Sequence, residues 1–445
     1  MLSPLVATFR SPDLRKKIFY ALGILVLYRI GATLPSPGVD FREINRCVDA
    51  ASQGDSGQIY SLINMFSGGA LLQLSVFAIG IMPYITASII VQLLTVVIPR
   101  FEQLRKEGQS GQTKMTQYTR YLTVALALLQ STGIVALAAT GNLLPASGED
   151  CNPDQILQDT SILGLSIIVL VMTAGACLVM WFGELITERG VGNGMSLLIF
   201  VGIVARLPAE GRTILQQRGG LTFGLICVAI VLILVAVVFV EQGMRRIPVQ
   251  YAKRMVGRKM YGGSSTYMPI KVNTAGVIPV IFASSLLYIP QLILQLTGGQ
   301  NTDGETAGWK LWLEANLINP SSWFHITFYF LLIIFFTYFY VAVTFNPEER
   351  ADDMKRYGGF IPGIRPGKPT ADYLSYVLSR ITLPGSLYLG IISILPNLFM
   401  DLSGGTGQNI PFGGTALLII VVVGLDTIKQ VNSQLMQRKY EGFLK

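Results

Sequence analysis

Long apolar stretches separated by short polar segments run through the whole chain. A helix that crosses a membrane needs about 20 mostly apolar residues. The stretches that approach this length are 18–34, 77–98, 121–140, 161–182, 221–240, 272–296, 324–345, 373–396 and 411–428. A weaker run, 194–207, is shorter and is interrupted by Arg206 and Pro208. Counted as a span, it brings the prediction to ten membrane helices.

The distribution of positive charge supports this count. Lys and Arg gather on the cytoplasmic side of membrane proteins. We assign the N-terminus to the cytoplasmic side. The cytoplasmic segments then hold 26 of the 34 Lys and Arg residues and the segments on the opposite side hold 6, while Arg29 and Arg380 lie within spans. Without the weak span, the cation-rich loop 241–271 would lie outside. The asymmetry therefore predicts ten spans with both termini in the cytoplasm.

Composition narrows the class of protein. Of all residues 51% are hydrophobic and only 13% are charged, whereas soluble proteins carry about 25% charged residues. This excludes a soluble enzyme, a disordered chain and a secreted disulfide scaffold. The four cysteines are scattered singly, and His325 alone cannot build a His-based metal or catalytic cluster. We therefore expect no metal, no cofactor and no catalytic residue.

Two of the predicted spans share a pattern. Gly80-Ile-Met-Pro83-Tyr-Ile85-Thr-Ala-Ser and Gly276-Val-Ile-Pro279-Val-Ile281-Phe-Ala-Ser both read G-x-x-P-x-I-x-A-S. They are the second helices of two five-helix halves, residues 1–215 and 216–445, and they cross the membrane in opposite directions. Such an inverted repeat is typical of membrane transport proteins. The Gly and Pro are either a packing kink or a hinged pair at the seam between the halves.

Residues 59–74 are apolar, but they are too short and too rich in glycine to cross a membrane. They lie on the outer side, directly before the second span. The segment is either an interfacial amphipathic helix or a re-entrant segment folded into a central cavity.

The spans offer few ionisable residues at mid-depth, where secondary transporters bind substrate or coupling ions. A pathway here would be lined by aliphatic and small polar side chains, and a hydrophobic constriction excludes ions by dewetting. This disfavours an ion-coupled carrier and a charge-selective channel. An insertase without a through-pore would need a polar groove open to lipid. A purely structural subunit is disfavoured by the segment 59–74.

Two inner loops, 241–271 and 346–372, are long and basic. The first carries seven cations interleaved with Tyr251, Tyr261 and Tyr267. Such a surface binds RNA phosphates or an acidic protein face. No ATP-binding motif is seen, because Gly367-Lys368 lacks the remaining residues of a phosphate loop. Any energy must therefore come from a partner.

Many short motifs together resemble the SecY/Sec61-alpha family, the central channel subunits of protein translocases, over essentially the full length. They include Phe66-Ser-Gly-Gly-Ala70, Lys106-Glu-Gly, Gln117-Tyr-Thr-Arg120-Tyr, Ile186-Thr-Glu-Arg189-Gly-Val-Gly-Asn193-Gly, Tyr251-Ala-Lys-Arg254, Lys271-Val-Asn273, Phe345-Asn-Pro347, Pro362-Gly-Ile-Arg365-Pro-Gly367 and Phe412-Gly-Gly-Thr415. The resemblance implies ten helices in two inverted halves around a central pore, which passes unfolded secretory polypeptides. It also implies that the chain is not an enzyme.

The family's residue roles fall on four sets of positions. The resemblance implies an apolar pore ring of Ile81, Ile85, Met195, Ile199, Ile281 and Ile419. Met195 replaces the family's frequent isoleucine. It implies a plug at 59–74 with Ile63, Met65, Phe66, Ser67, Gly68, Gly69 and Leu71. It implies a lateral gate between the second and seventh spans with Pro83, Ile89, Gln92, Asn193, Asn273, Pro279 and Ser285. It implies docking of the SecA motor or the ribosome on Lys253, Arg254, Arg258, Lys259, Arg365 and Lys368.

The resemblance also implies partners and a location. The expected partners are SecE, SecG, SecA, the ribosome with its RNA, signal sequences, nascent polypeptides and membrane lipids, with SecDF and YidC in larger assemblies. Membrane segments of the substrate would leave sideways through the gate. The expected location is the bacterial cytoplasmic membrane, and also a thylakoid membrane in an organism that has one.

Overall fold

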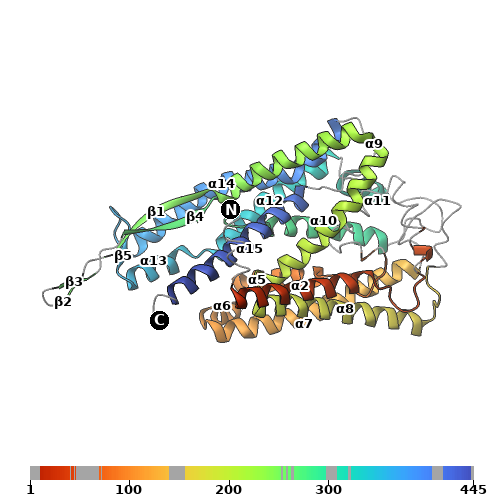
Figure 1. Ribbon diagram of the computed structural model, residues 1–445, viewed down its shortest axis with the longest axis horizontal. Coiled ribbons are helices and arrows are strands. Elements are labelled where there is room, and N and C mark those ends of the chain that lie inside the picture. Colours follow the sequence, from red (N-terminus) through yellow and green to blue (C-terminus); the bar gives the residue numbers. More distant parts are fainter. Residues whose placement is uncertain are drawn as a thin grey trace.

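Helices make up most of the computed structural model (Figure 1). The structure describes residues 11–40, 42–44, 46, 70–71, 73–139, 156–251, 254–256, 259–261, 265–296, 308–318, 322–402 and 414–441. In the first half of the chain the helices are α2 (Pro12–Thr33), α5 (Met82–Val97), α6 (Pro99–Lys106), α7 (Gln109–Ala139), α8 (Ile162–Arg189) and α9 (Gly194–Gln242). The later helices are α10 (Ile278–Leu296), α11 (Gly308–Leu313), the π-helix η2 (Glu314–Ile318), α12 (Trp323–Thr344), α13 (Pro347–Arg356), α14 (Lys368–Leu402) and α15 (Gly414–Glu441).

The predicted polytopic helical membrane protein is confirmed. Among the described residues, six helical stretches are long and apolar enough to cross a membrane: Gln109–Ala139, Ile162–Arg189, Phe223–Gln242, Trp323–Arg356, Lys368–Leu395 and Thr415–Met436. The helices α5 and α6 meet at a 97° bend, and Gly194–Pro208 and Ile278–Leu287 are shorter apolar helices. The count of ten spans depends on these shorter pieces and on α2, so it stays a prediction.

The predicted fifth and sixth spans are joined in one element, α9, which folds back on itself. A straight helix rises about 1.5 Å per residue, so Gly211 and Phe223 would lie about 18 Å apart along the axis. Instead, a Cβ added to Gly211 would lie 3.8 Å from the Phe223 ring. The reversal therefore lies between Gly211 and Phe223, and Pro208 lies inside the helix just before it. The helix therefore has two limbs that face each other.

The loop 241–271 contains a small sheet that the sequence analysis missed. The strands β1 (Met244–Tyr251) and β4 (Ser265–Lys271) pair antiparallel, and β5 (Gly359–Phe360) pairs with β1. A separate pair, β2 (Arg254–Val256) and β3 (Lys259–Tyr261), forms a short hairpin. Because β1 lies in one predicted docking loop and β5 in the other, the order β4-β1-β5 joins the two loops into one unit.

Among the residues that the structure describes, three apolar clusters hold the helices together. The central cluster draws on α2, α8 and α9 from the first half and on α10, α12, α14 and α15 from the second. A second cluster, built on α7 and α8, includes Leu74, Ile156 and Ile168. A third packs Ile247 and Ile270 of the sheet against the start of α14. The central cluster is therefore where the two halves meet.

The sequence repeat is also a repeat of local structure. Gly80 and Gly276 have nearly equal left-handed φ angles, +60° and +64°, a region that side chains other than glycine rarely occupy. In each case the helix begins two residues later, and Pro83 and Pro279 occupy its second position. Proline is tolerated there because the first turn has no hydrogen-bond acceptor for its N–H. The second span therefore begins at Met82, later than the predicted 77–98.

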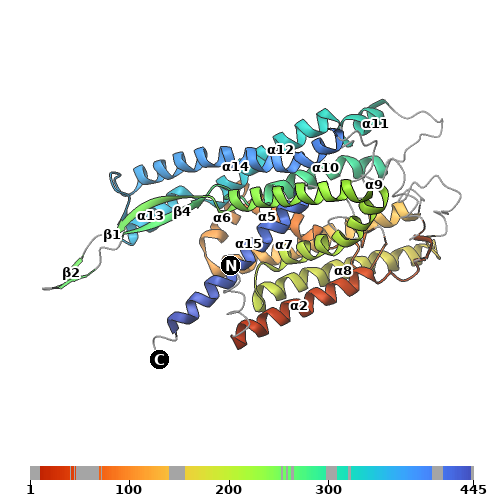
Figure 2. The ribbon, with the colours of Figure 1, turned by 45° about the horizontal axis from the view of Figure 1, so that its top comes forward.

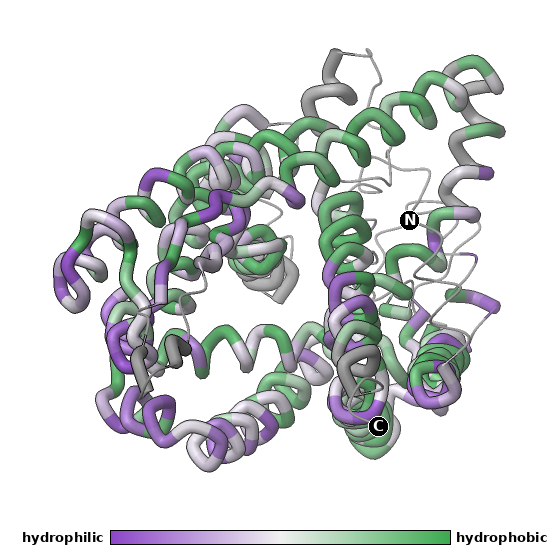
Figure 3. Tube along the Cα trace, turned by 60° about the vertical axis from the view of Figure 1, so that its left-hand side comes forward, coloured by the Kyte–Doolittle hydropathy of each residue, from purple (hydrophilic) through white to green (hydrophobic). Residues whose placement is uncertain are grey.

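Segments that the sequence places on the same side of the membrane lie at the same end of the molecule. The sheet, α6 and α13 lie at one end, and α11 lies at the other (Figures 1 and 2). Figure 3 turns the first of these ends forward, and hydrophilic residues concentrate on the segments nearest the viewer. This arrangement agrees with the loop assignment from the positive charges.

The contact between α8 and the turn before α5 predicts a strong effect of one methyl group. A Cβ on Gly175 of α8 would collide with the backbone carbonyl of Val76, whereas a Cβ on Gly133 of α7 would meet nothing within 4 Å. Overpacking typically costs about 1–3 kcal/mol. We expect Gly175→Ala to lower the melting temperature of the purified protein in detergent by several degrees, and Gly133→Ala to leave it unchanged or raised. Equal melting temperatures for the two variants would contradict this packing.

Candidate functional site

The six side chains of the expected pore ring gather in the central cluster. Four of them are buried, with exposed fractions between 1% and 8%: Ile81, Ile199, Ile281 and Ile419. Ile85 and Met195 are half-buried and pack against the same cluster. The six come from the turn before α5, from α5, from the first limb of α9, from α10 and from α15. Residues far apart in the sequence thus belong to one apolar cluster.

The chemistry of this contact is simple. Aliphatic side chains offer no hydrogen bonds and no charge, so water gains little by entering between them. Such a constriction excludes ions by dewetting. Ile85 and Ile281 occupy the same position of the repeat, five residues after Gly80 and Gly276. The inverted pattern therefore places one expected ring residue in each half.

The expected plug lies almost wholly outside the described residues. Ile63, Met65, Phe66, Ser67, Gly68 and Gly69 fall in the part of the chain that the structure does not describe. Leu71 is described and packs, half-buried, against the second apolar cluster. Leu74 follows it with a φ of +44° and is fully buried. The chain therefore makes a constrained turn between the expected plug and α5.

The two helices of the expected gate contact each other. α10 contacts α5 and also α7. Ile89 and Gln92 of α5 are half-buried, and so is Ser285 of α10. The Ser285 hydroxyl oxygen is buried without a hydrogen-bond partner, which is costly in an apolar setting.

The two asparagines expected near the gate have local structural partners. Asn193 caps the N-terminus of α9, where its Oδ1 accepts from the N–H groups of Met195 and Ser196. Such a cap is worth about 1 kcal/mol. Asn273 is buried, and its Oδ1 accepts from the Gly276 N–H while its Nδ2 donates to the Gly276 carbonyl and to Glu241. These bonds fix the turn that leads into α10.

Two charged contacts were missed by the sequence analysis. Glu241, at the end of α9, is only 5% exposed and accepts a 2.5 Å hydrogen bond from Asn273. Arg120 of α7 donates two hydrogen bonds, of 2.8 and 2.7 Å, to the carboxylate of Glu184 on α8. The sequence showed these side chains at the ends of apolar runs, but not which of them would meet.

The described residues of the expected docking set lie at the end of the molecule that carries the sheet. Arg254 and Lys259 are in the hairpin β2–β3, while Lys253 and Arg258 lie outside the described residues. Arg365 and Lys368 are exposed. Their turn has left-handed backbone at Gly363 and Gly367, with φ of +83° and +102°. The Thr370 hydroxyl donates to the Arg365 carbonyl at 2.8 Å, which fixes the turn.

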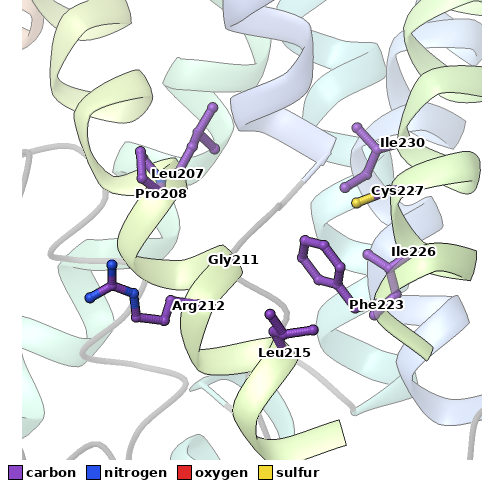
Figure 4. A pocket seen from close by; sticks show the side chains of 9 residues that line it. All are labelled: Leu207, Pro208, Gly211, Arg212, Leu215, Phe223, Ile226, Cys227 and Ile230. Atoms are coloured by element: carbon purple, nitrogen blue, oxygen red, sulfur yellow. The ribbon is translucent and has the colours of Figure 1, made fainter. Parts of the chain in front are cut away.

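A cavity of about 480 Å³ lies between the limbs of α9 (Figure 4). Phe223 and Ile230 point from the second limb toward the first, whereas the Arg212 guanidinium points away from the second limb (Figure 4). None of its lining residues belongs to the expected ring. The pocket is therefore bordered by residues of both limbs and lies apart from the expected ring.

Comparisons with known proteins agree with one another. The SecY family model matches residues 75–428. The chain is 68% identical to the protein translocase subunit SecY of Mycobacterium bovis, 60% to that of Corynebacterium glutamicum and 59% to that of Streptomyces coelicolor, each over the whole of both chains.

Solved structures share the fold at low sequence identity. A structure described as a protein-conducting channel is 19% identical, with a TM-score of 0.61 over 94% of this chain and 91% of that one. Sec61 in a canine ribosome–channel complex is 17% identical, with a TM-score of 0.58 over 94% and 91%. From the family model and the close relatives, the chain belongs to the SecY family of protein translocase subunits.

Proposed function

We propose that this chain is a protein-conducting channel whose closed pore is sealed by the six-residue ring Ile81, Ile85, Met195, Ile199, Ile281 and Ile419. The observation that carries the proposal is the convergence of these six positions, from both halves, on the central cluster. An aliphatic ring resists ions because they would lose their hydration. An unfolded polypeptide that enters the ring separates its side chains sterically and fills the space between them.

The lateral gate is the contact between α5 and α10. A signal sequence is itself an apolar helix, and it replaces contacts between the two gate helices with its own. It shifts the channel toward the open state only by binding that state more tightly than the closed one. Apolar segments of the substrate leave through the same opening into lipid. The matching starts of α5 and α10 support a hinged pair rather than two unrelated kinks.

The two halves, residues 1–215 and 216–445, move about α9. Their boundary falls in the turn between the limbs of α9, beside the cavity. The reversal of the chain there, where a Cβ on Gly211 would lie 3.8 Å from the Phe223 ring, supports α9 as the connection about which the halves move. The plug 59–74 closes the outer side of the ring, and Leu71 is held at its base by the second cluster.

Energy and substrate arrive at the docking unit formed by the loops 241–271 and 346–372. The shared sheet β4-β1-β5 supports this proposal, because it makes the two loops move together. SecA or the ribosome docks there, with ribosomal RNA against the cations of the β2–β3 hairpin. SecE and SecG complete the complex, which lies in the bacterial cytoplasmic membrane with both termini inside.

An ion-coupled carrier is the rival reading. Within the part of the chain that the structure describes, the buried charged residues are Glu241 and Lys310. Glu241 is the penultimate residue of α9, and Lys310 is in the short helix α11. Neither lies at the middle of a span, where a carrier would bind its coupling ion.

A photo-crosslinking experiment tests the pore. A photoreactive amino acid replaces Ile281 in the ring or, as a control, Leu232 on the second limb of α9, which is 66% exposed. An export substrate is stalled midway by a folded C-terminal domain in the presence of SecA and ATP. We expect substrate adducts at Ile281 and none at Leu232. Translocation without adducts at Ile281 would show that the pore axis is wrong.

A charge reversal tests the docking unit. We expect Arg365→Glu to lower SecA-dependent translocation about tenfold, because reversing a charge in an interface turns attraction into repulsion. Arg15→Glu is the control, since Arg15 is an exposed cation on α2, outside both docking loops. The initial rate of protease protection of a substrate in membrane vesicles is measured. Equal rates for the two variants would remove Arg365 from the docking site.

A further inference from the structure

Arg105 joins the two halves at the end of the molecule that carries the sheet. It lies on α6, which directly follows α5, and its Nη1 donates a 2.9 Å hydrogen bond to the carbonyl oxygen of Val343. Val343 is in the last turn of α12, and α12 packs against α10. The bond therefore connects α6, which follows the expected gate helix α5, to α12, which packs against the other expected gate helix, α10.

The sequence around Val343 explains why its carbonyl oxygen accepts a bond from outside the helix. The last four carbonyl groups of a helix lack partners within it. A continuing helix would bond the Val343 oxygen to the N–H of residue 347, but that residue is Pro347 and has no N–H. The N–H groups of Glu348 and Glu349 bond instead to the Asn346 side chain. Arg105 thus provides a donor that the chain after α12 cannot provide.

Charge favours the same approach of α6 to this corner. The C-terminal end of a helix carries partial negative charge, so a cation is stabilised there. The neighbouring residue Lys106 pairs with Glu102 at 2.8 Å and is attracted more weakly by Glu349, at the start of α13. Arg105 therefore contacts the end of α12, and Lys106 lies within electrostatic reach of the start of α13. Arg105 and Lys106 are exposed to solvent, which keeps both attractions weak enough to break.

We propose that Arg105 is a latch of the lateral gate: its bond to Val343 holds the cytoplasmic end of the gate shut and breaks before α5 and α10 separate. The inference rests on the proposed function, since that function assigns the gate to α5 and α10. A latch adds a fixed cost to opening. A strongly apolar signal sequence overcomes this cost by binding the open state, and a weak one does not. Arg105 is thus a residue that sets how apolar a signal must be.

Removing the latch is expected to help weak signals selectively. With a substrate whose signal has a shortened apolar core, Arg105→Ala should raise the translocation rate about fivefold, because a charge-assisted bond of the closed state is lost. With a full-strength signal the rate should change less than about twofold, because that signal already drives opening. Arg105→Lys should fall nearer to the wild type, since lysine keeps the charge and a donor.

The matched control is Arg100→Ala, which removes an exposed cation from the other end of α6. A weak-signal rate for Arg105→Ala equal to that of Arg100→Ala, or below the wild-type rate, would overturn the latch. Photo-crosslinking at Ile281 is run in the same membranes. Substrate adducts at Ile281 with an unchanged weak-signal rate reject the latch alone. Translocation without these adducts in the wild type rejects the proposed function, and the latch with it.

A distance measurement tests the latch without a substrate. Spin labels are placed at Gln103 on α6 and Asp352 on α13, both of which are exposed. We expect Arg105→Ala to broaden the distribution of label distances and to shift it to longer values, while Arg100→Ala leaves it unchanged. Identical distributions in the two variants would show that Arg105 does not hold the halves together.

Discussion

The structure depends on one apolar contact, the central cluster in which residues from both halves meet. Most membrane proteins bury such a contact permanently, but a protein-conducting channel has to open it and close it again. Aliphatic side chains suit this task because dispersion forces are individually weak and have little directionality. The closed contact excludes water and ions. After a polypeptide has passed, it can re-form without restoring any specific hydrogen bond or ion pair.

In the proposed mechanism, the remaining elements confine this opening to one place. The limbs of α9 connect residues 1–215 to residues 216–445 on one side. The paired starts of α5 and α10 give the other side two similar movable helices. The sheet contacts α14 through the third cluster and leads into α10 through the Asn273 turn, so in the proposed mechanism it carries the push of a docked partner to these two helices. Weak polar contacts at the rim, such as that of Arg105, then adjust the threshold.

The sequence predicted the helices well because a membrane span must be long and apolar. The repeat at Gly80 and Gly276 was visible because a left-handed turn before a helix strongly favours glycine. The strands were missed because β1 carries two arginines in a stretch that was assigned to a basic loop, and because β5 pairs with β1 from more than 100 residues away. The roles of the ring residues came from the resemblance to a known family. The partners of Glu241 and Arg120 could not be predicted, since an acid or a base at the end of a span suits the membrane surface equally well.

The resting ion conductance of the purified channel in a planar bilayer tests the seal most directly. Ile281→Asn introduces a polar side chain into the ring, whereas Ile168→Asn does so in the second cluster, where Ile168 is 1% exposed. The account predicts frequent ion-conducting openings without substrate for Ile281→Asn and a quiet bilayer for both Ile168→Asn and the wild type. Quiet bilayers for all three proteins, or equal leaks from both variants, would contradict a seal made by the ring.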